Sequence, residues 1–379
     1  MKLWRSISIT AITLSAALAI PLRLAAQDSQ DRNQSKFVTF DVPGAGTGSF
    51  QGTFAGTINP AGVVAGAYSD TSGVNHGFRR SPDGAITTFD AAGAGTGAGQ
   101  GTFPVSNDVS RSVTGYYLDA SNVYHGFVRA LDGTITTFDA PHAGAGTYQG
   151  TFPVAINPSG AIAGVYHDTD DVIHGFLRTP DGSFTEFDAP GADTSPGLGT
   201  IVAGVDGITP AGVIAGFYVD SSGVAHGYLR APDGGFTTFD VSGAGTGPGQ
   251  GTFNENIGVT ATTTGWYIDS GGALHAFLRT PKGAITKFDA PNAGTGAGQG
   301  TSAGGITPAG VIACAFSDAN NVYHGCVRAR DGAISEFNVP GAGTGPGQGT
   351  IPSVINPAGV ITGSYADANN VFHGFLRVP

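Results

Sequence analysis

One short unit repeats along most of the chain, and this repetition restricts the possible folds more than any other feature of the sequence. A single histidine recurs seven times, and five of the six intervals are 49 residues long while one is 52. These histidines are His76, His125, His174, His226, His275, His324 and His373. Phe-Asp pairs keep the same period from Phe40-Asp41 onward, and Phe337-Asn338 closes the series. Self-similarity at such a period is typical of repeat architectures.

Each unit divides into four short apolar runs separated by residues that favour turns. In the third copy we expect strands at residues 151–156, 161–167, 172–177 and 183–188, with turns at Asn157-Pro158-Ser159-Gly160 and Pro180-Asp181-Gly182. Four antiparallel strands in a unit of about 40 to 50 residues describe one blade of a propeller. The sequence therefore predicts an all-β fold, a seven-bladed β-propeller.

The two ends of the repeat region predict how the ring closes. The first expected strand, residues 37–42, matches the fourth strand of a unit, whereas the last, residues 371–377, matches the third. The N-terminal strand can therefore complete the last blade, a strand-swapped closure. Such closure removes two open sheet edges that would otherwise invite aggregation.

A glycine and an aromatic residue, twelve positions apart, recur in six of the copies. The pairs are Gly66 and Phe78, Gly115 and Phe127, Gly164 and Phe176, Gly216 and Tyr228, Gly265 and Phe277, and Gly363 and Phe375. We expect each ring to cover its glycine across a hairpin. The sixth copy has Cys314 and Cys326 at these positions, which predicts a disulfide in an exported protein. Two buried free thiols are the alternative.

The first residues predict export. Residues 1–26 combine a basic start at Lys2 and Arg5, an apolar stretch over residues 7–20 and the small residues Ala25-Ala26, as in a signal peptide. The apolar run is shorter than the ~20 residues that span a bilayer. We expect residues 27–36 to form a linker, residues 37–379 a single propeller, and the mature protein to be secreted, periplasmic or extracellular, without a membrane anchor.

Charge limits the class of partner. The formal net charge is −11, and removal of Lys2, Arg5 and Arg23 with the signal peptide would make it −14. Nucleic-acid binding needs a basic face to replace counterions, so this class is disfavoured. We expect a monomer that contacts an extracellular glycan or protein and uses no cofactor and no metal.

The repeated histidines and the aspartates six residues before them suggest chemistry at first sight. The aspartates are Asp70, Asp119, Asp168, Asp220, Asp269, Asp318 and Asp367. A residue present in every blade is more simply explained by what every blade needs, so we interpret them as turn caps and hydrogen-bonding partners. One functional alternative survives the repetition, a lectin-like ring with one equivalent pocket per blade. The scarcity of tryptophan beyond residue 26, where only Trp266 occurs, weighs against it.

A single site would instead lie where the repeat is broken. The fourth copy has three additional residues within 200–208, which bring Asp206 toward the inner strand, and the fifth copy contains Glu255. These two could form a carboxylate pair for glycoside cleavage, and His142 with Tyr148 could form an acid–base pair for polysaccharide elimination. Further candidates for ligand binding are Asn254, Asn256, His167, Trp266 and Gln149.

The unit from Ile355-Asn356-Pro357-Ala358-Gly359 to His373-Gly374-Phe375-Leu376 resembles the bacterial extracellular repeats called the HAF family. The signature itself stands at His275-Ala276-Phe277, and other copies read His-Gly-Phe or a close variant. The resemblance implies export and a propeller-like array, and it carries over no catalytic residue. The sequence thus favours a secreted, non-enzymatic binding or scaffold propeller that contacts carbohydrate or protein through its loop face. A propeller lyase or glycoside hydrolase with one site at the channel mouth is the alternative.

Overall fold

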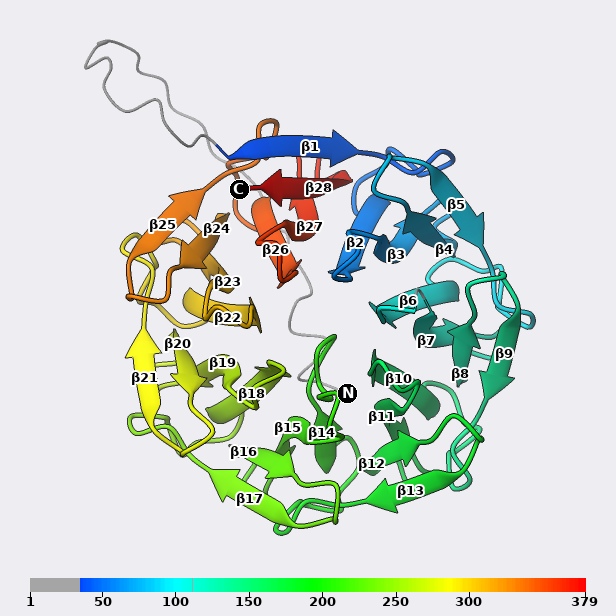
Figure 1. The fold of residues 1–379 in the computed structure, drawn as a ribbon, viewed down its shortest axis with the longest axis horizontal. Helices are drawn as coiled ribbons and strands as arrows, with labels where there is room; N and C mark the ends of the chain where they lie inside the picture. Colours follow the sequence, from blue (N-terminus) through cyan, green and yellow to red (C-terminus); the bar gives the residue numbers. More distant parts are fainter. Residues whose placement is uncertain (1–34, 111) are drawn as a thin grey trace, which may run out of the picture.

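The computed structural model describes residues 35–110 and 112–379 and arranges them as a ring of seven four-stranded blades (Figure 1). Within each blade, strands A to D are counted outward from the central channel. The predicted signal peptide lies outside the described residues. No helix in the described part of the chain is long and apolar enough to span a membrane.

The strands follow the repeat from blade to blade. Blades 1 to 4 consist of β2 (Gly52–Ile58), β3 (Val64–Ser69), β4 (Asn75–Arg80) and β5 (Ile86–Phe89); β6 (Gly101–Asn107), β7 (Val113–Leu118), β8 (Tyr124–Arg129) and β9 (Ile135–Phe138); β10 (Gly150–Ile156), β11 (Ile162–His167), β12 (Ile173–Arg178) and β13 (Phe184–Phe187); and β14 (Thr200–Val202), β15 (Ile214–Val219), β16 (Ala225–Arg230) and β17 (Phe236–Phe239). Blades 5 to 7 consist of β18 (Gly251–Ile257), β19 (Thr263–Ile268), β20 (Leu274–Arg279) and β21 (Ile285–Phe288); β22 (Gly300–Ile306), β23 (Ile312–Ser317), β24 (Tyr323–Arg328) and β25 (Ile334–Phe337); and β26 (Gly349–Ile355), β27 (Ile361–Ala366) and β28 (Phe372–Val378) with β1 (Lys36–Phe40). The predicted strands of the third copy agree with these bounds within one residue at each end.

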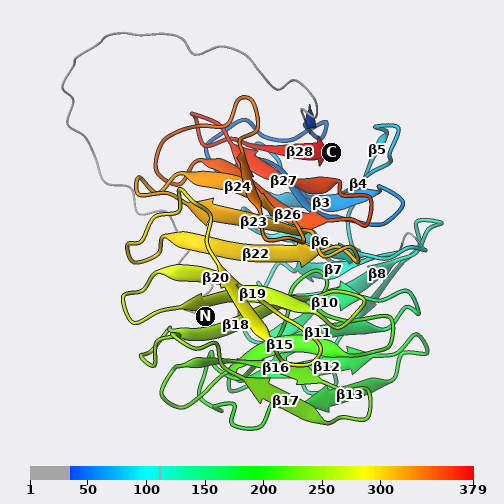
Figure 2. The same cartoon turned by 60° about the vertical axis from the view of Figure 1, so that its left-hand side comes forward.

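The ring closes as the sequence predicts. β1 pairs antiparallel with β28, with Lys36 opposite Val378 and Phe40 opposite Gly374, and so supplies strand D of blade 7. Figure 1 shows β1 lying along the outer side of β28 in this blade, and Figure 2 shows the strands of successive blades stacked around the ring. The all-β, strand-swapped propeller is therefore confirmed.

The glycine–aromatic pairs form the centre of each blade. Gly66 lies opposite Phe78 in the β3–β4 pair, and the other five predicted pairs have the same register. The Phe78 ring is fully buried, and a Cβ at Gly66 would lie only 3.0 Å from it and closer still to the Phe54 carbonyl oxygen. Only glycine fits under the ring, which explains why the two residues recur together.

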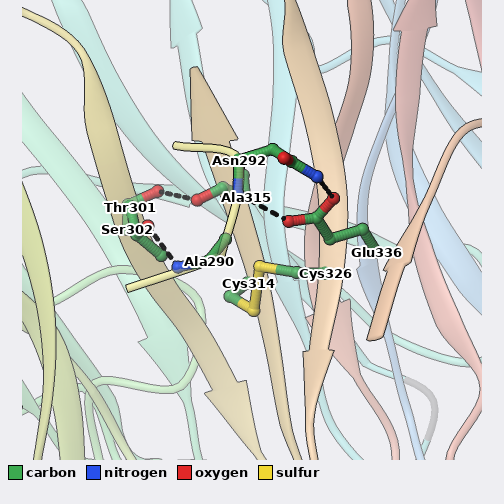
Figure 3. Close-up of a disulfide and its surroundings, with 8 residues drawn as sticks. All are labelled: Ala290, Asn292, Thr301, Ser302, Cys314, Ala315, Cys326 and Glu336. Carbon is green, nitrogen blue, oxygen red and sulfur yellow. Dashed lines mark hydrogen bonds between the residues drawn. A yellow bond between two sulfur atoms is a disulfide. The ribbon is translucent and has the colours of Figure 1, made fainter. Parts of the chain in front are cut away.

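Blade 6 replaces this pair with a covalent bond. Cys314 on β23 lies opposite Cys326 on β24 with the Cα atoms 4.8 Å apart, and the sulfur atoms are bonded (Figure 3). Both residues are buried in the blade interior with Phe316. The predicted disulfide is confirmed.

Neighbouring blades are held together by a cation–π contact that repeats around the ring. An arginine at the end of strand C lies over the strand D phenylalanine of the preceding blade, as Arg178 does over Phe138 at 4.6 Å. The equivalent pairs are Arg80 and Phe40, Arg129 and Phe89, Arg230 and Phe187, Arg279 and Phe239, Arg328 and Phe288, and Arg377 and Phe337. Partial desolvation makes such contacts worth about 1–2 kcal/mol each. The phenylalanine of each Phe-Asp pair is thus an inter-blade contact.

Candidate functional site

On the face that carries the B–C and D–A connections, called here the loop face, each blade holds a histidine between two acidic or amide side chains. In blade 3, His174 Nδ1 lies 2.9 Å from an Asp188 carboxylate oxygen and His174 Nε2 lies 3.3 Å from Asp168 Oδ2. The imidazole also stacks on the Tyr166 ring with centroids 5.0 Å apart. The geometry is rigid because three different strands or turns fix one ring.

The inner aspartate of this group also caps the B–C turn. Asp168 Oδ1 accepts hydrogen bonds from the backbone N–H groups of Asp170 and Val172 at 2.9 and 2.8 Å. Burial opposes the charge, but these donors and His174 hold the pKa of Asp168 below its usual value. The hydrogen bond to Asp188 outweighs burial and raises the pKa of His174. The prediction that the repeated aspartate caps a turn and the histidine has an acidic partner is confirmed.

The same arrangement recurs in all seven blades. Each histidine contacts an inner aspartate of the B–C turn and an outer residue just after strand D. The outer residues are Asp90, Asp139, Asp188, Asp240, Asp289, Asn338 and, across the closure, Asp41. The outer carboxylates are about half exposed, for example 54% for the Asp188 side chain. Sequence reasoning treated the Phe-Asp pairs as period markers and missed this contact, although the constant spacing of fourteen residues was visible.

A hollow lies beside this group in blade 6. It has a volume of about 440 Å³ and is lined by His324, Asp318, Asn338 and Glu336 together with Asn292 from the preceding D–A loop. Glu336 accepts hydrogen bonds from the backbone and side-chain N–H groups of Asn292 at 3.1 and 2.6 Å (Figure 3). A smaller hollow beside Asp41 and His373 lies against the D–A loop that joins blades 7 and 1. The loop face thus has a polar hollow in blade 6 and a smaller hollow where blades 7 and 1 meet.

A glutamine recurs at the end of six of the seven D–A loops, directly before the first glycine of strand A, and it stabilises the loop itself. Gln149 Oε1 accepts the N–H of Gly146 at 2.9 Å, and its Nε2 donates to the Thr169 carbonyl at 3.0 Å. This fixes the D–A loop against the B–C turn of the same blade. Gln149, a predicted ligand-binding residue, therefore has both ends of its amide engaged within the fold.

The additional residues of blade 4 enter the central channel. After β14 the chain leaves the strand and returns at Ile208, and Figure 1 shows this segment reaching toward the ring axis. The Val205 carbonyl accepts a hydrogen bond from Ser106 Oγ of blade 2 at 2.9 Å, and the Asp206 carbonyl accepts one from Ile257 of blade 5 at 3.1 Å. The Val205 side chain packs against an apolar cluster of blades 7 and 1. This channel insertion, residues 203–207, therefore spans the channel.

Both predicted carboxylates lie in this channel. Glu255 occupies the bulge of β18, where the register shifts between Asn254 and Asn256. Burial raises the pKa of Glu255 to about 7, although the Gly204 N–H donates to its carboxylate, and burial raises the pKa of Asp206 to about 6. Glu255 faces the insertion, whereas Asp206 Oδ2 lies beside Gly305 on β22. The structure places the two carboxylates in one channel with separate neighbours, and their catalytic role stays a prediction.

The other predicted acid–base pair has separate neighbours too. His142 Nδ1 contacts Glu186 Oε2 at 2.6 Å, and the His142 side chain is 76% exposed at the outer rim of the loop face. The Tyr148 ring lies 6.2 Å from the Tyr124 ring, measured between centroids. Each residue is therefore held by a partner that sequence analysis did not consider, and joint catalysis by His142 and Tyr148 stays a prediction.

The remaining candidates lie within the blades. His167 contacts Asp171 Oδ1 at 2.8 Å, and burial lowers its pKa despite this carboxylate. Trp266 stacks on the Phe253 ring. The Asn254 side chain is fully buried and its Nδ2 donates to the Tyr228 carbonyl at 3.0 Å, while Asn256 is buried opposite Thr264. Their proposed binding role is not tested by these contacts.

Among residues 35–110 and 112–379, no group of three or more His, Cys, Asp or Glu side chains is arranged to hold a metal ion.

Comparison with known proteins identifies similar folds among solved structures. No family model matches the sequence, and no curated protein matches it. The crystal structure of the BP39L lectin from Burkholderia pseudomallei is similar with a TM-score of 0.56 at 10% identity, covering 85% of this chain and 94% of the lectin. A puromycin hydrolase is similar with a TM-score of 0.53 at 15% identity, and 84% of this chain matches only 51% of that chain. These similarities show a β-propeller fold, and the resemblance to HAF repeats stays a prediction.

Proposed function

We propose that this protein is a secreted, non-enzymatic propeller that binds carbohydrate through its loop face. The observation that carries the proposal is the histidine group described above, which repeats in every blade with its outer carboxylate or amide half exposed. Carboxylates, amides and imidazoles that share one concave surface suit the dense hydroxyl groups of a sugar. Charged acceptors form hydrogen bonds about twice as strong as neutral ones.

Multivalent binding can compensate for a low affinity at each single site. A shallow hollow binds a single sugar weakly, but seven similar sites on one rigid face can engage a branched or polymeric glycan at once and raise its avidity by about 10²–10⁴. The hollow of blade 6 is large enough to receive one sugar ring and is lined by acceptors and amide donors. The BP39L protein, which has the same fold, is a lectin.

Export belongs to the same proposal. The sequence of residues 1–26 matches a signal peptide, and a disulfide suits an oxidising compartment outside the cytoplasm. A protein released into such a compartment meets cell-surface and extracellular glycans.

A glycan array probed with the mature protein tests the proposal. We expect binding that weakens when Asp90, Asp139, Asp188, Asp240 and Asp289 are all replaced by alanine, because each exposed acceptor is removed. The matched control replaces Asp83, Asp132, Asp181, Asp233 and Asp331, which lie in the C–D turns on the opposite face. Absence of any glycan signal for the intact protein, or equal binding by both multiple variants, would refute the proposal.

A second candidate function rests on the channel carboxylates. A carboxyl group whose pKa is raised toward neutrality can act as a general acid, and Glu255 and Asp206 meet this condition. Polysaccharide cleavage by the intact protein that is lost in Glu255→Gln and in Asp206→Asn would support a glycoside hydrolase. Glycan binding that both variants retain, without product formation by the intact protein, supports the binding ring.

A further inference from the structure

One position in the D–A loops divides the blades into two groups. Five blades have glycine there, and its φ lies between +77° and +82° at Gly99, Gly197, Gly249, Gly298 and Gly347. The other two have aromatic residues, Phe50 and Tyr148, each with φ +65°. A bulky residue in this left-handed region is strained by about 1–3 kcal/mol, and such strain is concentrated at functional sites.

The loop itself does not need a side chain at this position. A Cβ added to Gly99, Gly298 or Gly347 would meet no atom within 4 Å, so the side-chain direction opens to solvent. The Phe50 side chain is 44% exposed, and it is the only aromatic residue among the exposed large hydrophobic residues of the described chain. Tyr148 is half-buried. The two rings therefore stand on the surface of the loop face.

Further aromatic rings accompany Phe50 and Tyr148. At the boundary of blades 7 and 1, Phe54 of strand A and Phe372 of strand C pack with centroids 4.7 Å apart. At the boundary of blades 2 and 3, Phe152 and Tyr124 occupy the same two positions at 3.9 Å, and Tyr124 also contacts Tyr148.

The remaining five boundaries lack this set of three aromatic residues, one each in the D–A loop, strand A and strand C. Their loop position is glycine, and their strand C position holds Asn75, Ile173, Ala225, Leu274 or Tyr323. Three aromatic residues therefore coincide at two of the seven boundaries only, the same two at which the loop backbone is strained.

A backbone hydrogen bond fixes the loop that carries each ring. The Phe50 N–H donates to the Asn370 carbonyl at 2.7 Å, and the Tyr148 N–H donates to the Asn122 carbonyl at 2.6 Å. Asn370 and Asn122 themselves have φ of +61°. The loop backbone under each ring is therefore held before a ligand binds, which lowers the entropy lost when a ligand is immobilised there.

We propose that Phe50 and Tyr148 are stacking platforms for pyranose rings, and that they create two principal sugar sites, one at each aromatic boundary. This inference rests on the proposed carbohydrate-binding function and names the residues that contact the sugar. A pyranose presents an apolar C–H face that covers an aromatic ring, while its hydroxyls reach polar groups beside it. At the boundary of blades 2 and 3 the aromatic contacts continue from Phe152 to the polar pair of His167 and Asp171, with the His167 ring 5.9 Å from the Phe152 ring. The net charge of −11 disfavours an anionic membrane as the occupant.

The variants Phe50→Gly and Tyr148→Gly give the two loops the residue that the other five blades already have. We expect each to fold with an unchanged or higher Tm, because the backbone strain is removed. Affinity for methyl glycosides of glucose, galactose, mannose and fucose, measured by titration calorimetry, should fall about tenfold or more for the sugars that bind the intact protein. Phe50→Tyr and Tyr148→Phe are the matched controls and should retain binding.

Two results overturn the inference. A double glycine variant that binds glycans as strongly as the intact protein shows that the rings do not contact sugar, and it leaves the carbohydrate-binding proposal in place. A double glycine variant with a lowered Tm assigns the rings to the fold. If the intact protein binds no glycan on an array, the proposed function itself fails.

Discussion

Neutralising Glu255 should stabilise the protein above neutral pH and have little effect in acid. Burial raises the pKa of this carboxyl from 4.5 to about 7. Between these values the folded state binds more protons than the unfolded state, so stability falls as pH rises through this window. Because each unit of this difference in pKa corresponds to about 1.4 kcal/mol, ionised Glu255 destabilises the fold by up to about 3 kcal/mol at pH 8. The partial exposure of the side chain lowers this to about 1–3 kcal/mol.

The assay compares the Tm of the intact protein with that of Glu255→Gln at pH 4 and pH 8. With an unfolding entropy of about 2.1 cal/mol/K per residue, a propeller of this length loses about 0.7 kcal/mol per kelvin near its midpoint. We therefore expect the variant to melt about 1–4 °C higher at pH 8 relative to its difference at pH 4. Asp170→Asn, which removes an exposed carboxylate of a B–C turn, is the control and should show no such change. A Tm difference for Glu255→Gln that is the same at both pH values would refute the reasoning.

Three further predictions follow from the fold. Deletion of residues 36–42 exposes the edge of β28 and should cause unfolding or aggregation, so a truncated chain that is monomeric by light scattering and melts normally would contradict strand-swapped closure. Cys314→Ala with Cys326→Ala should lower stability by about 3 kcal/mol, whereas Cys314→Gly with Cys326→Phe recreates the pair of the other blades and should recover most of it in the same melting experiment. The hydrogen bond from the Ala273 N–H lowers the pKa of Asp269 in the folded state. Ionised Asp269 therefore stabilises the fold at neutral pH, and this stabilisation is lost as pH falls below about 4. An Asp269→Asn variant should lose less stability than the intact protein between pH 6 and pH 3, measured by thermal melting.

The period of the sequence was enough to predict the blades, the closure and the disulfide, because each depends on spacing alone. Gly66 and Phe78 are paired by a short hairpin, and the same spacing places Cys314 beside Cys326. The channel insertion could not be placed, since its path depends on contacts with residues far away in sequence. Ser106 is about a hundred residues before the carbonyl to which it donates. The contact between Arg178 and Phe138 was missed because it joins two different blades, although both residues recur at the period of the repeat.

The two departures from the repeat differ in how far the fold explains them. The channel insertion is accounted for by its own contacts, because Val205 packs against blades 7 and 1 and the backbone bonds to blades 2 and 5. Phe50 has no such account, since five other blades have an unstrained glycine at its position and its side chain is 44% exposed. A large apolar residue that strains the loop and leaves much of its ring in solvent is explained best by something outside the fold. The search for a ligand should therefore begin at the two aromatic boundaries rather than in the channel.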